Sequence, residues 1–495
     1  MKAFHKIGTT LGLAGSLLLA TSCTDHFEDL NANPNAADSA DPAYILSYVQ
    51  VGVSGHRFEM WRSNLLHALV WSNQMSSPWL AGTPYQTNDG WATAYWDRSY
   101  ERLVGGINDV VRQLEATPAE NLEDKPAQLA IANIWKVFIF HRLTDFWGDI
   151  PYSQAGQGIE GILQPAYDGQ ESIYQDMLST LESAVADLSA GENAFGSADL
   201  IYGGDQGQWI QFANSLRLRL AMRLSNANAG LAEQHVAAVF NQPLIEVNAD
   251  NARMLHTTGD QFDVGTNGSN APIVAEFNGN YISASMMGLL VNDAANTADD
   301  DPRLPVYALP NASGDYVGLP NGSGATIGEG ESFSLPNYQS HPNGGTPLFA
   351  LEADAMFLSA AEVAFLKAEA VVRGWASGDA AALYEAGIQR SLEQHGVATN
   401  ADFEAAVAYA GGSTEAQLEQ ICTQKWIALM GDGWEAFAEV RRTGYPAFDA
   451  ADVNGELPRR LRYPISEQTL NADSYTDAVA AQGGDTEATR MYWDK

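Results

Sequence analysis

The chain has 495 residues, and its 61 acidic residues against 26 basic ones give a formal net charge of −35. This excess of negative charge argues against a nucleic-acid partner, because phosphates would be repelled. Apolar residues make up 45% of the sequence, which is a globular composition with ample material for a core. At this length we expect two sub-regions or one elongated helical array.

The first residues have the pattern of an export signal. Two lysines precede an apolar run over residues 7–20, which is too short to span a bilayer as a helix. The sequence LATSC at residues 19–23 resembles a bacterial lipobox, in which the cysteine is acylated and becomes the mature N-terminus. We therefore expect residues 1–22 to be a cleaved signal peptide and Cys23 to carry a lipid anchor. The alternative is an ordinary secreted protein in which Cys23 happens to lie near the cleavage site.

Residues 23–42 are acidic and rich in Asn and Pro, which predicts a tether. Helical periodicity begins after it. Apolar residues at helical spacing predict helices over residues 43–75, 126–145, 170–189, 207–225, 354–373 and 378–395. The last two are joined by a short turn and resemble a tetratricopeptide-type hairpin. The pattern predicts a mainly α fold built from paired helices.

Residues 241–350 differ in composition from the helical segments. Asn, Gly, Pro, Ser and Thr dominate, and helical periods vanish apart from a short stretch near residues 283–295. A segment of this kind within a compact protein is usually a functional excursion over the scaffold. We predict one domain over residues 43–495, with a helical scaffold, this loop-rich ligand-facing insertion and an irregular tail. The scaffold covers residues 43–240 and 351–443, and the tail covers 444–495.

No catalytic or zinc-binding motif stands out. The nine histidines contain no HxxxH pair, and neither GxSxG nor GxxxxGK[ST] occurs. Cys422 lies in an apolar helical pattern, which is typical of a buried residue. A cluster containing Asp299 and Asp301 could offer oxygen ligands to Ca²⁺, but it lacks EF-hand spacing, and solvated loop charges are the alternative. We expect no cofactor unless a structural calcium ion binds there.

Aromatic residues gather between residues 71 and 96, partly in a polar stretch of loop composition. Their flat rings are good platforms for sugar rings or peptide side chains, and nearby amides and hydroxyls can form hydrogen bonds. Trp71 and Tyr95 fall in helical patterns and are assigned to the core. The other rings are predicted to bind ligand, with core packing as the alternative: Trp79, Tyr85, Trp91 and Trp96, and in the insertion Tyr281 and Tyr338.

Several stretches resemble the SusD/RagB family of nutrient-binding outer-membrane lipoproteins, in its SusD-like group. They occur in the expected order and cover nearly the whole mature chain. They are FEDLNANPN at 27–35, RLTDFWGDIPYSQA at 142–155, YDGQESIYQ from Tyr167, DLIYGGDQGQWIQFANSLRLRLAMRLS at 199–225, DPRLP at 301–305, MGDGWEAFAEVRRTGYPAF at 430–448, RLRYP at 460–464 and MYWDK at 491–495.

The resemblance implies a SusD-like fold with tetratricopeptide-like hairpins and a scaffold role for Trp434, Arg441 and Arg442. It also implies a non-enzymatic, lipid-anchored protein that faces the exterior of the outer membrane. Such a protein would deliver oligosaccharides or peptides to a SusC-like, TonB-dependent transporter. Together with the aromatic cluster, this predicts a glycan-binding lipoprotein. A peptide-binding member of the same family and a surface hydrolase are the alternatives.

Overall fold

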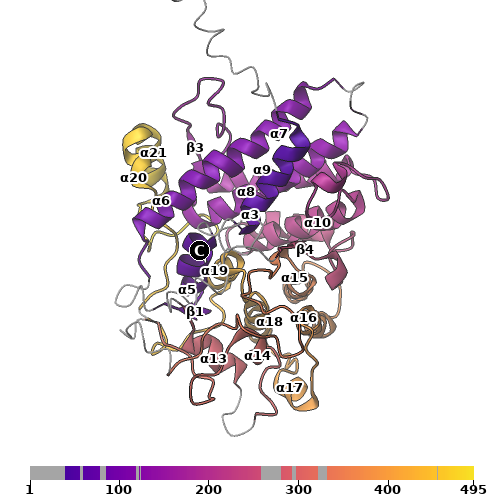
Figure 1. The fold of residues 1–495 in the computed structure, drawn as a ribbon, viewed down its shortest axis with the longest axis vertical. Coiled ribbons are helices and arrows are strands. Elements are labelled where there is room, and N and C mark those ends of the chain that lie inside the picture. The colour runs from indigo at the N-terminus through magenta and orange to yellow at the C-terminus, as the bar shows by residue number, and fades with distance from the viewer. Residues whose placement is uncertain are drawn as a thin grey trace, which may run out of the picture. The chain divides into compact units, whose positions relative to one another are not determined.

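The computed structural model describes residues 40–55, 60–77, 85–118, 122, 124–257, 280–291, 297–321, 332–453 and 455–494. Contacts divide the chain into residues 1–41 and residues 42–495, and all secondary-structure elements given below belong to the second unit. Cys23 and Trp79, two residues with predicted roles, lie outside the described ranges. Helices dominate the described part of the chain, which confirms the predicted mainly α class (Figure 1).

The helices fall into two groups along the chain. The first comprises α3 (Pro42–Gly55), the π-helical η1 (Trp61–Ala68), α5 (Leu69–Trp71), α6 (Asp89–Arg98), the π-helical η3 (Ser99–Val104), α7 (Gly105–Ala116), α8 (Lys125–Trp147), α9 (Gln170–Ala186), η5 (Gly196–Ala198), α10 (Gln206–Arg223), α11 (Ala229–Val239) and η6 (Asn248–Asp250). The second comprises α13 (Ala284–Leu290), α14 (Leu304–Tyr307), α15 (Ala360–Val372), α16 (Ala380–Gln394), α17 (Ala401–Ala406), α18 (Thr414–Ala428), α19 (Gly433–Thr443), α20 (Ile465–Leu470) and α21 (Ala472–Gln482). None of these described helices is both long and apolar enough to cross a membrane.

Long helices pack side by side within each group, and a contact between α10 and α15 links the groups (Figure 1). In the first group, α7 packs against α3 and α8, α8 against α9, and α10 against both α9 and α11. In the second, α15 packs against α16 and α18. Because α10 also contacts α15, it connects the helices that precede the loop-rich insertion to those that follow it.

Strands are few and short. Three two-stranded antiparallel ladders occur in the described chain: β1 (Met75–Ser76) with β5 (Tyr281–Ile282), β2 (Ile150–Pro151) with β3 (Tyr167–Asp168), and β4 (Ala252–Met254) with β6 (Ala355–Leu358). Two of the three ladders include a strand from residues 241–350. The insertion is therefore attached to the helical scaffold by backbone pairing.

Most helices that the periodicity predicted are confirmed, as α8, α9, α10, α13, α15 and α16. The helix expected from residue 354 begins only at Ala360, because β6 precedes it and the Ser359 side chain caps its first turn. Residues 43–75 are not one helix, since α3 ends at Gly55 and a strand begins at Met75. The tail is not irregular throughout, because α20 and α21 lie within it.

Charged side chains of α10 are buried where this helix meets α15 and α19. The Arg219 guanidinium donates to both carboxylate oxygens of Glu362 at 2.7 and 2.5 Å, and each side chain is 1% exposed. Arg223, one turn later, lies 2.5 Å from Glu435. Burial by itself lowers the pKa of an arginine. Attraction to Glu362 and Glu435 outweighs this effect and raises the pKa of Arg219. Attraction to Glu435 and Asp145 does the same for Arg223. These ion pairs therefore bind helices from both groups together.

A second buried group joins α15, α18 and α19. Arg442 donates to the two carboxylate oxygens of Glu369 at 2.6 and 2.7 Å and to Glu439 at 2.9 Å. Lys425 donates to Glu439 at 3.0 Å. Cys422 lies near these carboxylates and is 1% exposed, and burial raises the pKa of its thiol well above the ordinary value. Cys422 is thus the buried, neutral side chain that the sequence predicts.

Glu369 gives this interior a testable pH dependence. Burial raises the pKa of Glu369, but Arg442 outweighs it and lowers the pKa from 4.5 to about 2. A carboxylate whose pKa is lowered by folding contributes stability above its unfolded pKa and loses that contribution as the pH falls through the folded value. Between about pH 5 and pH 2, the wild-type free energy of unfolding should therefore fall by about 3 kcal/mol more than that of Glu369→Gln. Denaturant titrations across this range measure the difference.

Glu246→Gln is the matched control for this substitution. Glu246 pairs with Lys367, but its side chain is 59% exposed, so its removal should change stability by no more than about 1 kcal/mol and keep the wild-type pH profile. Parallel pH profiles for wild type and Glu369→Gln would show that the buried pair does not control acid stability.

Candidate functional site

A short strand pair brings distant parts of the chain together. In the β1–β5 ladder, Met75 lies opposite Ile282 and Ser76 opposite Tyr281. The ranges 78–84, 258–279 and 322–331 fall outside the described residues, and each has an end covalently joined to this region. We call the group the β1–β5 platform; it consists of residues 73–77, 85, 280–285 and 319–321.

Asn73 is the hub of the platform. Its backbone adopts the left-handed conformation, with φ of 61°, which asparagine tolerates better than most residues. Its Oδ1 accepts hydrogen bonds from Asn321 Nδ2 and, at 3.5 Å, from the Tyr85 hydroxyl. Its Nδ2 donates to Ser285 Oγ at 2.6 Å, and its carbonyl oxygen accepts from Ser283 Oγ at 2.6 Å. One side chain and its backbone thus connect four segments of the chain.

The composition of the platform differs from that of the whole chain. None of its residues is charged, although 61 of 495 residues in the chain are acidic. Asparagine, glutamine, serine and tyrosine supply most of its polar groups. These polar side chains are themselves buried, since Asn73 and Gln74 are 0% exposed and Asn321 is 2% exposed, and their hydrogen bonds to one another hold the segments of the platform together.

The structure brings Tyr85 and Tyr281 together at the platform but buries both rings. Tyr85 is 8% exposed and Tyr281 is 0% exposed, with the Tyr281 ring centroid 6.3 Å from that of Phe333. Burial corrects the expectation that these two rings present free faces to a ligand. Tyr85 instead supports the platform through its bond to Asn73.

Of the two predicted ligand-binding tryptophans within the described residues, Trp91 is partly exposed. It lies in the first turn of α6, where Asn88 caps the helix by accepting from the Trp91 backbone N–H at 3.1 Å. Its ring centroid lies 4.7 Å from that of Trp61, which is also partly exposed. The sequence analysis did not select Trp61, because it falls within a helical pattern. The two indoles form a ring pair that can contact a ligand.

Trp96 belongs to the core, which corrects its assignment as a ligand platform. Its ring is 3% exposed and lies at centroid distances of 5.0 Å from Trp147 and 4.7 Å from Tyr100. Tyr167 and Tyr463 complete the surrounding ring cluster. The alternative of core packing is therefore confirmed for Trp96. Trp71 and Tyr95 are buried as expected.

The remaining predicted residues lie outside the platform. Tyr338 is partly buried against the main core, and its hydroxyl accepts a hydrogen bond from Gln339 at 3.2 Å. Asp301 is neither a solvated loop charge nor free to bind calcium, because its two carboxylate oxygens accept from Arg303 at 2.9 and 2.6 Å in the interior. Asp299, two residues before Asp301, is partly buried.

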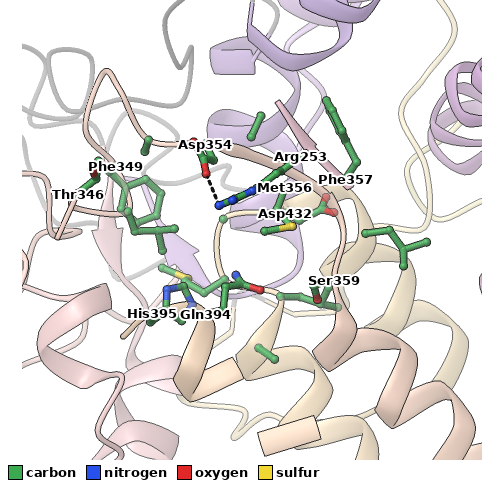
Figure 2. Close-up of a pocket in the computed structure, with 18 of the residues that line it drawn as sticks. Arg253, Thr346, Phe349, Asp354, Met356, Phe357, Ser359, Gln394, His395 and Asp432 are labelled. Carbon is green, nitrogen blue, oxygen red and sulfur yellow. Dashed lines mark hydrogen bonds and ion pairs between the residues drawn. The ribbon is translucent and has the colours of Figure 1, made fainter. Parts of the chain in front are cut away.

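A cavity of about 400 Å³ lies beside the β4–β6 ladder and was not predicted from the sequence. Figure 2 shows Phe349, Met356 and Phe357 among its apolar walls. Thr346, Ser359 and Gln394 contribute uncharged polar groups to the lining. These residues come from a loop, a strand and two helix ends, and no periodicity or motif links them in the sequence.

The charged groups of this cavity are already paired. Arg253 lies 2.8 Å from Asp354, the pair joined by the dashed line in Figure 2. Burial lowers the pKa of His395 to about 3, so its ring is neutral near neutral pH. Every carboxylate among the described lining residues has a basic partner within 4 Å, in the pairs Arg253–Asp354, Arg219–Glu362, Arg390–Glu393 and Arg142–Asp432. The described lining therefore suits ligand binding better than acid–base catalysis.

Comparisons with known proteins agree with this architecture. The chain matches a SusD-like family model, described as starch-binding associating with outer membrane, over residues 34–464. A chitin-binding protein of known structure is 30% identical, with a TM-score of 0.77, and the match covers 92% of this chain and 100% of that one. A chitin-binding SusD homolog from Flavobacterium johnsoniae is 28% identical, with a TM-score of 0.78 and coverage of 92% and 98%.

A SusD homolog from Bacteroides ovatus is 25% identical, with a TM-score of 0.77 and coverage of 92% and 99%. No curated protein matches the chain. The family model spans most of the sequence, and the solved structures share its helical fold. The chain belongs to the SusD-like family.

Proposed function

We propose that the protein is a non-enzymatic, lipid-anchored glycan-binding protein of the outer-membrane surface. It passes oligosaccharides to a SusC-like, TonB-dependent transporter. The observation that carries this proposal is the similarity to two chitin-binding proteins, at 30% and 28% identity over 92% of the chain. The description of the family model names a glycan ligand and the outer membrane as well.

The ligand site proposed here is the ring pair of Trp61 and Trp91, and the buried β1–β5 platform holds the chain in place at Tyr85, six positions before Trp91. An indole face offers a large contact area to a sugar ring at little cost in conformational entropy. A chitin oligosaccharide carries no net charge, and the apolar faces of its sugar rings can lie against the two indoles. Trp79, which precedes Tyr85 by six positions, stays a predicted member of this site.

The proposed ligand site includes neither of the two calcium candidates, Asp299 and Asp301. Asp301, one of the two calcium candidates, is held by Arg303 in the interior. Cys23 is the proposed lipid attachment point, because it follows an apolar signal and a lipobox-like sequence.

Replacing Trp91 tests the ring pair directly. Trp91→Ala should weaken binding of a chitin oligosaccharide by about 1–3 kcal/mol, the range seen when an aromatic stacking platform is removed. Trp79→Ala should act in the same direction. Isothermal titration calorimetry measures the affinity, and a thermal melt shows that each variant is folded.

Two further tryptophans serve as controls. Trp375, three residues after the end of α15, is partly exposed and lies against Arg373, so Trp375→Ala should leave oligosaccharide affinity unchanged. Trp96→Ala should instead lower the free energy of unfolding by about 3–5 kcal/mol, because it leaves a cavity in the core. Equal loss of affinity in Trp91→Ala and Trp375→Ala would show that the ring pair is not part of the ligand site.

Lipid attachment is tested separately. Cells fed an alkyne-labelled fatty acid should incorporate the label into the wild-type protein and not into Cys23→Ala, and only the wild type should fractionate with the outer membrane. A wild-type protein that stays unlabelled and free in the periplasm would contradict the anchor.

A further inference from the structure

Three arginines face a smaller cavity next to the first. This cavity has a volume of about 90 Å³, and its lining residues come from α3, α6, η3, α8 and α19, with Met60 before η1. Arg98, Arg102 and Arg142 contribute to its walls, and no carboxylate occurs among its described lining residues. The chain has 26 basic and 61 acidic residues, so a cavity whose described lining holds three guanidinium groups and no carboxylate is an unusual arrangement.

Arg98 and Arg102 lack the partners that other arginines have. Within the described residues neither forms an ion pair or a side-chain hydrogen bond. Elsewhere on the surface Arg112 pairs with Asp109 and Arg390 with Glu393. Arg98 and Arg102 are four residues apart at the junction of α6 and η3, so they project from the same side of this helical segment. Their donors are therefore available to an anion in the cavity.

Arg142 approaches the same space from the interior. Its side chain is 6% exposed, and its guanidinium carbon lies 4.2 Å from the Trp434 ring centroid and 4.6 Å from that of Phe138. Its ion pair with Asp432 is long, at 3.8 Å between nitrogen and oxygen, and includes no hydrogen bond. Burial lowers the pKa of Arg142, whereas carboxylate partners raise the pKa of Arg219. The charge of Arg142 is thus less well compensated than that of its buried neighbour.

We propose that this arginine cavity binds the carboxylate of an acidic sugar, of the hexuronic acid class. A planar carboxylate can accept parallel N–H bonds from a guanidinium fork. Tyr48 also lines the cavity and is 50% exposed, so its ring can lie against the attached pyranose. The choice of a sugar as carrier rests on the proposed glycan-binding function.

The net charge of −35 does not prevent this binding. At physiological ionic strength the Debye length is about 8 Å, so charges on distant exposed surfaces are largely screened. The groups within the cavity therefore decide the affinity, and the described ones are three cations with apolar and hydroxyl-bearing neighbours.

Calorimetry with three small probes tests the inference on the full mature lipoprotein in detergent. Sodium glucuronate should bind, glucose should not bind measurably, and sodium acetate should bind more weakly than glucuronate. Arg98→Gln and Arg102→Gln should each weaken glucuronate binding by about ten- to one-hundredfold, the usual effect of removing a hydrogen bond to a charged group. Both side chains are partly exposed, so these variants avoid the folding risk of replacing the buried Arg142.

Two arginine variants outside the cavity are the matched controls. Arg112→Gln removes an exposed arginine of α7, and Arg253→Gln removes the arginine of the β4–β6 cavity; neither should change glucuronate affinity. Equal binding of glucose and glucuronate, equal binding of acetate and glucuronate, or equal losses in Arg98→Gln and Arg112→Gln would overturn the inference. A chitin oligosaccharide that binds while glucuronate does not would overturn it and leave the proposed function standing. Glucuronate binding without binding of any oligosaccharide would support the arginine cavity and contradict the proposed glycan-binding function.

Discussion

A buried guanidinium group needs oxygen acceptors at hydrogen-bonding distance, and this constraint sets how α10, α15 and α19 are arranged. An unpaired Arg219 or Arg442 in the interior would destabilise the fold by several kcal/mol, so each must meet its carboxylates at hydrogen-bonding distance. Glu362 and Glu369 lie two turns apart on α15, and each binds one of these arginines. The pairs therefore fix the position of α15 against α10 and α19 together.

The fixed scaffold in turn holds the neutral platform. Trp426 on α18 accepts a hydrogen bond at its carbonyl oxygen from the Gln74 side chain at 2.6 Å, and its indole N–H donates to the Ser72 carbonyl at 3.0 Å. Residues beside β1 are thereby attached to a helix from the other end of the chain. Buried charges such as Arg219 and Arg442 are paired in the helical interior, while the platform contains no charged side chain.

Periodicity predicted most of the scaffold because the spacing of apolar residues along an amphipathic helix can be read from a single stretch of sequence. It could not separate Trp91 from Trp96, which lie on the same helix, because the rings that bury Trp96 come from Trp147 and Tyr463 in distant stretches. Asp301 shows the same limit: its sequence neighbours indicate an acidic loop, but its oxygens are held by Arg303 in the interior. Both unpredicted cavities are lined by residues from several elements, so no single stretch could have revealed them.

Hydrogen exchange on the mature protein, with and without a chitin oligosaccharide, tests most directly the claim that the molecule binds glycans at the Trp61–Trp91 ring pair, whose two residues lie before and after segments held by the platform, and leaves these glycans intact. We predict slower exchange of backbone amides in residues 73–77, 88–91 and 280–285, with the oligosaccharide recovered at its original length by mass spectrometry. Unchanged exchange in these segments, slower exchange confined to residues 345–349 of the β4–β6 cavity, or a shortened oligosaccharide would contradict the account.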